Sequence, residues 1–110
     1  MAYITLTKDN YDQEVLRSTQ PVLVDFWAPW CGPCSALSPV IDEIAGEQSE
    51  VKVGKVNVDE QPELARQYRV MSIPTLMFFK NGELVRREVG GKSKGEILEI
   101  IGLDKARAGV

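Results

Sequence analysis

Residues 22–48 read VLVDFWAPWCGPCSALSPVIDEIAGEQ, and this stretch decides the fold. Val22–Trp27 is a nearly continuous apolar run, which is typical of a central strand buried on both faces. Pro33–Gln48 has the apolar spacing of an amphipathic helix, with apolar positions at Leu37, Val40, Ile41 and Ile44. The stretch therefore predicts a buried strand that is followed closely by a long helix.

Four segments on either side of this stretch also have recognisable patterns. Alternating or β-branched residues predict two strands, at Ala2–Leu6 and Val51–Val58. Apolar residues on one helical side, or a proline suited to a first turn, predict short helices at Asn10–Ser18 and Pro62–Tyr68. Strands and helices therefore alternate in this part of the chain, which favours a parallel core.

The pattern changes at Asn81-Gly82. This dipeptide is the strongest short hairpin signal, because a type I′ turn needs positive φ at both central residues. It joins two predicted strands as antiparallel neighbours, Thr75–Lys80 and Glu83–Val89. A capping box that begins at Ser93 opens a final helix, and residues 104–110 are expected to form a flexible tail.

The order of these elements predicts an α/β fold, with a five-stranded mixed sheet flanked by four helices. The chain has 110 residues and shows no internal repeat or linker, so we expect a single domain spanning residues 1–110. A chain of this length buries enough surface to hold a core without metals or structural disulfides.

Composition and charge exclude several partners and sites. The net charge of −3 is mixed along the chain, without the basic patch that nucleic acids or anionic membranes require. No apolar run approaches the roughly 18 residues of a membrane helix, and the first residues lack a secretory signal, so we expect a cytoplasmic protein. The chain contains no histidine, which excludes Ser-His-Asp and Cys-His catalysis and any His-ligated metal site within one chain.

The only two cysteines, Cys31 and Cys34, lie at the start of the predicted long helix. Unpaired N–H groups and the helix dipole favour negative charge there, and the thiolate is the reactive form of cysteine. A Cys31 thiolate can attack a disulfide in a target and form a mixed disulfide. Cys34, expected to be more buried, can then attack Cys31 and release the reduced target. Gly32 and Pro33 keep the connecting turn tight.

Two simpler interpretations of the cysteine pair stay open at this point. The cysteines can be buried structural residues, or half of a zinc site shared between two chains, because a C-x-x-C spacing alone is weakly specific. The preceding strand, the following helix and the sequence Trp-Cys-Gly-Pro-Cys at residues 30–34 favour redox chemistry over both.

Residues 24–34, VDFWAPWCGPC, resemble the active-site signature of the thioredoxin family. The resemblance covers roughly residues 2–103 and includes Pro39, Lys55–Asp59, Ile73-Pro74-Thr75 and Val89-Gly90-Gly91. It implies the thioredoxin fold and a monomeric protein-disulfide reductase with no bound cofactor, in which the cysteine pair itself carries the electrons. The implied partners are a thioredoxin reductase, which recharges the dithiol, and client proteins that contain disulfides.

Asp25 is an acid in an otherwise apolar strand. Burying an unpaired carboxylate is unfavourable, so its pKa should rise or it should find a partner. Lys55, which shares a strand face with Val51 and Val53, is the candidate partner. The matching Asp and Lys of the family help to move the proton of the inner cysteine. The resemblance therefore implies that Asp25 is the proton acceptor for Cys34, directly or through water; an exposed strand end is the alternative.

Pro74 begins a predicted strand, where a trans bond is the default. The resemblance instead implies a cis Ile73–Pro74 bond that faces the two cysteines. The Ile73 backbone could then pair with an extended client segment as an added strand. Trp30, Gly90 and Gly91 would complete a flat apolar rim for client binding. The alternative is a pair of ordinary turn glycines and one exposed tryptophan.

Other functions are compatible with the same fold. Oxidases and isomerases of this type usually carry a histidine between the cysteines, where this chain has Gly32-Pro33. A non-catalytic subunit or binding module would keep its role after both cysteines were replaced. Ser35 and Met71 stand where many relatives carry a basic residue, so the redox poise and the choice of partner can differ from those of the relatives.

Overall fold

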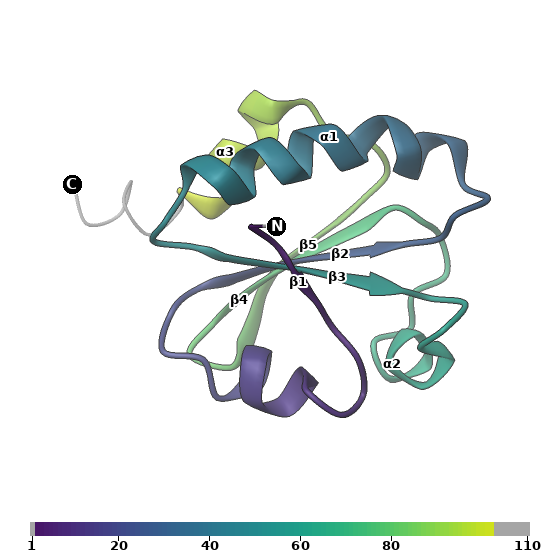
Figure 1. Cartoon of the computed structure of the whole chain (residues 1–110), viewed down its shortest axis with the longest axis horizontal. Helices are drawn as coiled ribbons and strands as arrows, with labels where there is room; N and C mark the ends of the chain where they lie inside the picture. Colours follow the sequence, from purple (N-terminus) through teal and green to yellow (C-terminus); the bar gives the residue numbers. More distant parts are fainter. Residues whose placement is uncertain (1, 103–110) are drawn as a thin grey trace.

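In the computed structural model, which describes residues 2–102, one mixed sheet lies between two layers of helices (Figure 1). The strands are β1 (Ile4–Thr5), β2 (Val22–Trp27), β3 (Lys52–Asn57), β4 (Thr75–Lys80) and β5 (Glu83–Val89). The helices are η1 (Asp12–Leu16), α1 (Gly32–Glu47), α2 (Pro62–Gln67) and α3 (Lys94–Ile101). The predicted α/β fold is confirmed; the expected tail at residues 104–110 lies outside the described residues.

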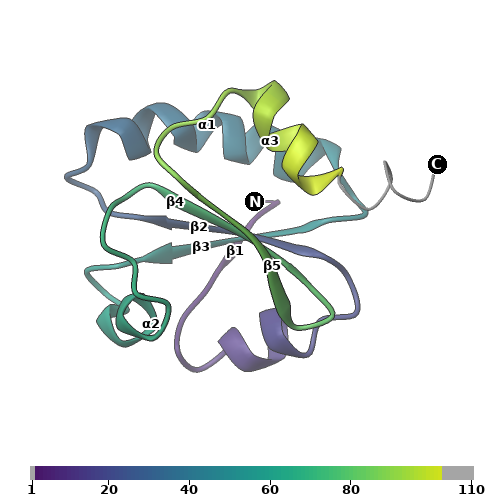
Figure 2. The ribbon, with the colours of Figure 1, turned by 180° about the vertical axis from the view of Figure 1, so that it is seen from behind.

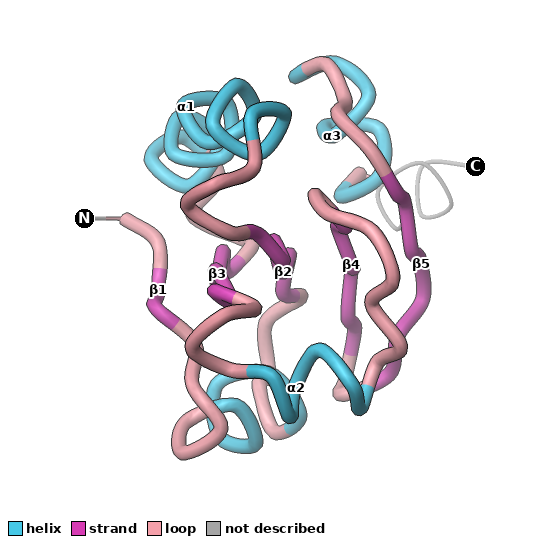
Figure 3. Tube along the Cα trace, turned by 90° about the vertical axis from the view of Figure 1, so that its right-hand side faces the viewer, coloured by secondary structure: helices cyan, strands magenta, loops and turns pink. Residues whose placement is uncertain are grey.

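The five strands lie in the order β1-β3-β2-β4-β5, which can be followed from left to right in Figure 3. The pairs β1–β3 and β3–β2 are parallel, and the pairs β2–β4 and β4–β5 are antiparallel. Asn81 and Gly82 both have positive φ, at 52° and 79°, so the predicted hairpin is confirmed. The strand β2 is therefore central, paired along both of its edges.

Side chains of β2 alternate between the two faces of the sheet and so contribute to both layers of the core. Val22, Val24 and Phe26 pack on the side of η1 and α2, whereas Leu23 packs against α1 and α3. Figure 2 shows α1 and α3 over the same face of the sheet and α2 beneath the other. Because side chains of a strand alternate between faces, Asp25 belongs to the layer between the sheet and α1.

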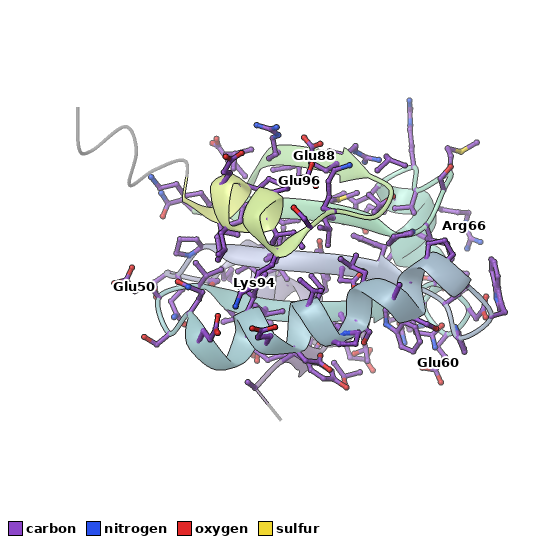
Figure 4. The ribbon with its side chains drawn as sticks, turned by 90° about the horizontal axis from the view of Figure 1, so that it is seen from above. Glu50, Glu60, Arg66, Glu88, Lys94 and Glu96 are labelled. Atoms are coloured by element: carbon purple, nitrogen blue, oxygen red, sulfur yellow. A yellow bond between two sulfur atoms is a disulfide. The ribbon has the colours of Figure 1, made fainter. Side chains whose placement is uncertain are left out.

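The two helices over this face are linked by Lys94, at the start of α3. Its ammonium lies 2.6 Å from Glu43 Oε1 and 2.8 Å from Glu47 Oε2, both on α1. Figure 4 shows Lys94 between the two helices. Partly exposed pairs of this kind stabilise a fold by only about 0–1 kcal/mol, so packing of the apolar helix faces is what holds α3 in place.

The first two elements are shorter than predicted. The strand expected at Ala2–Leu6 is only Ile4–Thr5, an edge strand that pairs with β3 alone. The helix expected at Asn10–Ser18 is a π-helical turn over Asp12–Leu16, in which the Arg17 N–H donates to the Asp12 carbonyl. None of the helices within residues 2–102 is long and apolar enough to cross a membrane.

Candidate functional site

The cysteine pair lies where β2 gives way to α1, at the end of the sheet that faces the viewer in Figure 3. Cys31 is the N-cap of α1, and its Sγ accepts a hydrogen bond from the Cys34 N–H at 3.2 Å. Gly32 and Pro33 begin the helix, and proline is favoured there because its missing N–H would be unpaired in any case. A sulfur at this position receives both an N–H hydrogen bond and the helix dipole, which stabilise a thiolate.

Cys31 and Cys34 form a disulfide, with their Cα atoms 5.2 Å apart. Cys34 is the more buried, at 2% exposure against 6% for Cys31, which is the order expected from the sequence. Cys31 is nevertheless less open than expected, because Trp27, Val58 and Ile73 pack around the pair. Two such sulfurs can alternate between a disulfide and a dithiol.

The segment before β4 lies against the disulfide. The Ile73–Pro74 bond is cis, as the resemblance implies, and the Ile73 carbonyl oxygen lies 3.8 Å from Cys31 Sγ. Gly90 donates its N–H to the Pro74 carbonyl at 2.8 Å and has a φ of 95°, a conformation that favours glycine. Gly91 follows it at the surface. The Ile73-Pro74 segment therefore contacts Cys31 on one side and is hydrogen-bonded to Gly90 on the other.

Trp30 projects beside the disulfide with 70% of its surface exposed. Its indole Nε1–H donates to Asp59 Oδ2 at 2.8 Å, which holds the ring although little packs on it. Between Trp30 and α2 runs a mainly apolar groove of about 300 Å³ that is bordered by Ile73 and by Met71, which is 91% exposed. Exposed apolar surface is a common feature of contact sites.

Asp25 lies behind the disulfide, buried at 2% exposure, so the alternative of an exposed strand end is wrong. It lines a small cavity of about 140 Å³ together with Cys34 and Ser38. Burial raises the pKa of Asp25 to about 7; the positive charge of Lys55 opposes this rise and the negative charge of Asp42 adds to it. Within the described part of the chain, Asp25 Oδ1 has no hydrogen-bond partner.

The expected pairing of Lys55 with Asp25 requires a correction. The two residues are neighbours across the β2–β3 ladder, but the Lys55 ammonium bonds to α1, at 2.8 Å from Ser38 Oγ and 2.7 Å from Asp42 Oδ1. It also lies 4.2 Å from the centre of the Tyr3 ring. Lys55 therefore acts on Asp25 through its charge, while its hydrogen bonds go to α1.

Sequence reasoning missed Ser38, Asp42 and Asp59. A signal for the first two is present, since Cys34, Ser38 and Asp42 follow one another at intervals of four along α1 and so share a helix face. This polar row points towards the layer that contains Asp25. No comparable signal identifies Asp59, which meets Trp30 only because the loops after β2 and β3 lie together.

The acidic residues do not gather into a metal site. Within residues 2–102, no group of three or more His, Cys, Asp or Glu side chains could hold a metal ion. Among these residues, the chemically distinctive feature of this end of the sheet is the disulfide with its buried acid.

Comparison with known proteins identifies the family. The thioredoxin family model matches residues 2–102. Thioredoxin 1 of Synechococcus elongatus is 58% identical over 90 residues, covering 81% of this chain and 84% of the relative. Thioredoxin of Pyropia yezoensis is 50% identical over 98 residues, covering 88% and 92%. The bifunctional thioredoxin reductase/thioredoxin of Mycobacterium leprae is 49% identical over 96 residues, covering 86% of this chain and 21% of that protein. The chain therefore belongs to the thioredoxin family, and its Cys31–Cys34 pair makes it a thiol–disulfide oxidoreductase.

Proposed function

We propose that this protein reduces disulfide bonds in other proteins and that a thioredoxin reductase returns it to the dithiol form. One observation carries the proposal: Cys31 Sγ is at the N-terminus of α1, accepts the Cys34 N–H, and lies 3.8 Å from the Ile73 carbonyl. A sulfur in these surroundings is favoured as a thiolate and is adjacent to a backbone that a client could pair with.

The exchange has two steps. The Cys31 thiolate attacks one sulfur of a client disulfide, so that a Cys31–client bond forms and the other client sulfur leaves as a thiolate. Cys34 then loses its proton and attacks Cys31 Sγ, which forms the Cys31–Cys34 disulfide and releases the second client thiolate. The client gains two electrons and the protein loses two, and the reductase supplies them again. The protein's own dithiol carries the electrons, so we propose that no bound cofactor takes part.

Asp25 is the proposed proton acceptor for Cys34, and the positive charge of Lys55 adjusts the pKa of Asp25. The proposal is supported by the cavity that Asp25 and Cys34 share. It is also supported by burial, which raises the pKa of Asp25 to about 7. A group with a pKa near the working pH can both accept and return a proton. Replacement of Asp25 by Asn should slow the resolution of a mixed disulfide and alter its pH profile; an unchanged profile would refute this role.

Client proteins are proposed to bind on Trp30, Ile73, Pro74, Gly90 and Gly91. The proposal is supported by the exposure of Trp30 and by the hydrogen bond that joins Gly90 to Pro74. An extended client segment could form backbone hydrogen bonds with Ile73, as in strand addition to a sheet. Glycine at positions 90 and 91 would let the client backbone approach closely.

The remaining proposals concern the setting of the reaction. We propose that residues 1–110 act as one monomeric domain in the cytoplasm, where glutathione and thioredoxin systems keep thiols reduced. The Mycobacterium leprae relative is, by its name, a thioredoxin reductase and a thioredoxin in one protein. That combination supports a thioredoxin reductase as the partner of this chain.

A trapping experiment tests the proposed exchange. The Cys34→Ser variant should accumulate a mixed disulfide with a disulfide-bonded test protein such as insulin, because Cys31 can attack but the product cannot be resolved. The Cys31→Ser variant, in which an oxygen replaces the sulfur of Cys31 and Cys34 is kept, should trap nothing. Full function of both variants would contradict catalysis and indicate a non-catalytic binding module.

The direction of the reaction is tested by a redox titration of Cys31–Cys34 against dithiothreitol, followed by tryptophan fluorescence. A strongly reducing potential would support a reductase. A markedly more oxidising potential would contradict this direction and favour an oxidase or isomerase.

A further inference from the structure

The Lys55 ammonium occupies a confined position beneath α1. The Lys55 side chain has only 8% of its surface exposed, although it carries a full charge. Three groups hold it: Asp42 Oδ1 at 2.7 Å, Ser38 Oγ at 2.8 Å, and the ring of Tyr3, whose centre is 4.2 Å away. An ammonium has three donors, and two of the three groups that hold this one lie on α1.

Asp25 is the carboxylate that this arrangement leaves without a hydrogen bond from Lys55. It is opposite Lys55 in the β2–β3 ladder, yet its Oδ1 accepts no hydrogen bond from any residue in the described part of the chain. Asp42 differs from Asp25 in being about half exposed, with its side chain at 49%. The buried cation is thus bound by the better solvated of the two carboxylates, while Oδ1 of the buried carboxylate has no hydrogen-bond partner among residues 2–102.

The charges around Asp25 come from few elements. β3 contributes Lys55, and α1 contributes Asp42 and the sulfur of Cys34. The segment before β1 contributes Tyr3, which contacts Lys55, whereas β4 places the uncharged Leu76 beside Asp25. Among residues 2–102, Lys55 and Asp42 are therefore the two full charges that adjust the pKa of Asp25, and they act in opposite directions.

We propose that Asp42, together with Ser38, is a positioning residue for disulfide exchange: it holds the Lys55 ammonium against α1 and away from Asp25, so that the buried carboxyl beside Cys34 is not paired directly with a cation. Direct pairing with Lys55 would favour the ionised carboxylate and weaken its hold on a proton. The α1 contacts prevent that pairing while leaving the cation close. This inference rests on the proposed role of Asp25 as proton acceptor for Cys34.

The first test is the Asp42→Asn variant. It removes the charge that holds Lys55, and because Asp42 is half exposed, the variant should fold normally. The pKa of Asp25, followed in the oxidised protein by the carboxyl ¹³C chemical shift, should fall by on the order of one pH unit. The pH profile for resolution of the mixed disulfide should move in the same direction. Ser38→Ala should lower the pKa of Asp25 by a smaller amount, because it removes one of the two bonds to α1.

Glu43→Gln is the matched control. It makes the same change of charge on the next residue of the same helix, but Glu43 binds Lys94 and not Lys55. We expect it to leave the pKa of Asp25 nearly unchanged. An equal decrease in Asp42→Asn and Glu43→Gln would mean that any negative charge on α1 has this effect, and would overturn the proposal.

A double-variant cycle separates positioning from a simple charge effect. Lys55→Gln alone should raise the pKa of Asp25, because a nearby positive charge is lost. In that background, Asp42→Asn should lower the pKa of Asp25 much less than it does with Lys55 present. The same decrease in both backgrounds would show that Asp42 acts through its own charge alone, and would refute the positioning role.

Failure of this inference can be told apart from failure of the proposed mechanism. The titration of Asp25 is measured without any catalytic step, so an unchanged pKa in Asp42→Asn overturns the positioning role whatever the activity. If the pKa of Asp25 falls but the resolution profile does not follow, the positioning of Lys55 is supported and the role of Asp25 as proton acceptor is refuted.

Discussion

The buried carboxyl of Asp25 should make this protein less stable as the pH rises, and Asp25→Asn should remove most of that dependence. In the folded state burial raises the pKa of Asp25 to about 7, whereas an unfolded chain has the ordinary value of 3.8. Between these two values the folded state holds a proton that the unfolded state has released. Raising the pH therefore favours the unfolded state, and the loss is complete once the pH exceeds about 7.

The size of the effect follows from the two pKa values of Asp25. Each pH unit of difference corresponds to about 1.4 kcal/mol, so a rise from 3.8 to about 7 destabilises the ionised form by on the order of 4 kcal/mol. A change from pH 5 to pH 8, which crosses the folded-state pKa of about 7, should remove roughly 2.5 kcal/mol from the free energy of unfolding. Asn cannot ionise, so the variant should lack this contribution.

The assay is equilibrium unfolding in guanidinium chloride, followed by tryptophan fluorescence, at several pH values from 5 to 8. The oxidised protein is used so that the cysteines do not titrate. Comparing the pH dependence within each variant cancels the constant effect of placing an amide in the core. Asp9→Asn, which removes an exposed carboxylate, is the matched control and should follow the parent protein. Equal pH dependence in the parent and in Asp25→Asn would refute the reasoning, because it would mean that Asp25 titrates alike in the folded and unfolded states.

Three further substitutions test other parts of the structure. Asp59→Ala removes the acceptor of the Trp30 indole N–H. It should raise KM for a disulfide client roughly twofold to fivefold with kcat unchanged. An unchanged KM would contradict a role in client binding for the Trp30 ring that Asp59 holds. Gly82→Ala places a Cβ at a φ of 79° and against the backbone carbonyl of Leu16. The free energy of unfolding, measured by denaturant titration, should therefore fall by about 1–3 kcal/mol. No loss of stability would mean that the hairpin turn relaxes to accommodate the Cβ. Ser35→Lys adds a cation beside the cysteines and should speed alkylation of reduced Cys31 at pH 6 by roughly twofold to fivefold; an equal change in the uncharged Ser35→Gln would exclude the charge as the cause.

Much of the fold could be predicted because its local signals agree with one another. The apolar run of β2 predicted a central strand, and Asn81-Gly82 predicted the hairpin that joins β4 to β5. Both signals depend on properties of adjacent residues, namely burial on two faces and positive φ. The ends of the sheet were less predictable, since the length of β1 depends on how far it pairs with β3 and not on its own residues.

The candidate site was predictable in its reactive groups and less so in their arrangement. The sequence Trp-Cys-Gly-Pro-Cys between a predicted strand and a predicted helix indicated the redox pair. The single acid in an apolar strand, Asp25, left two outcomes open, a raised pKa or a partner, and burial raises its pKa. The partner of Lys55 was predicted incorrectly, because a shared strand face gives proximity but not the direction of a long side chain. Asp42 competes for the same ammonium from a helix that packs over the sheet.

The sequence by itself thus determined the order of the elements, the central strand, the hairpin and the cysteine pair at a helix start. These features follow from composition and from spacing along a single strand or helix. Only the tertiary structure decided that Asp59 holds Trp30 and that α1 holds the Lys55 ammonium apart from Asp25. The family resemblance had already implied that Ile73 lies beside Cys31, and the structure shows this contact. Each of these contacts joins elements that are distant in sequence, so its geometry is set by how helices and loops pack on the sheet.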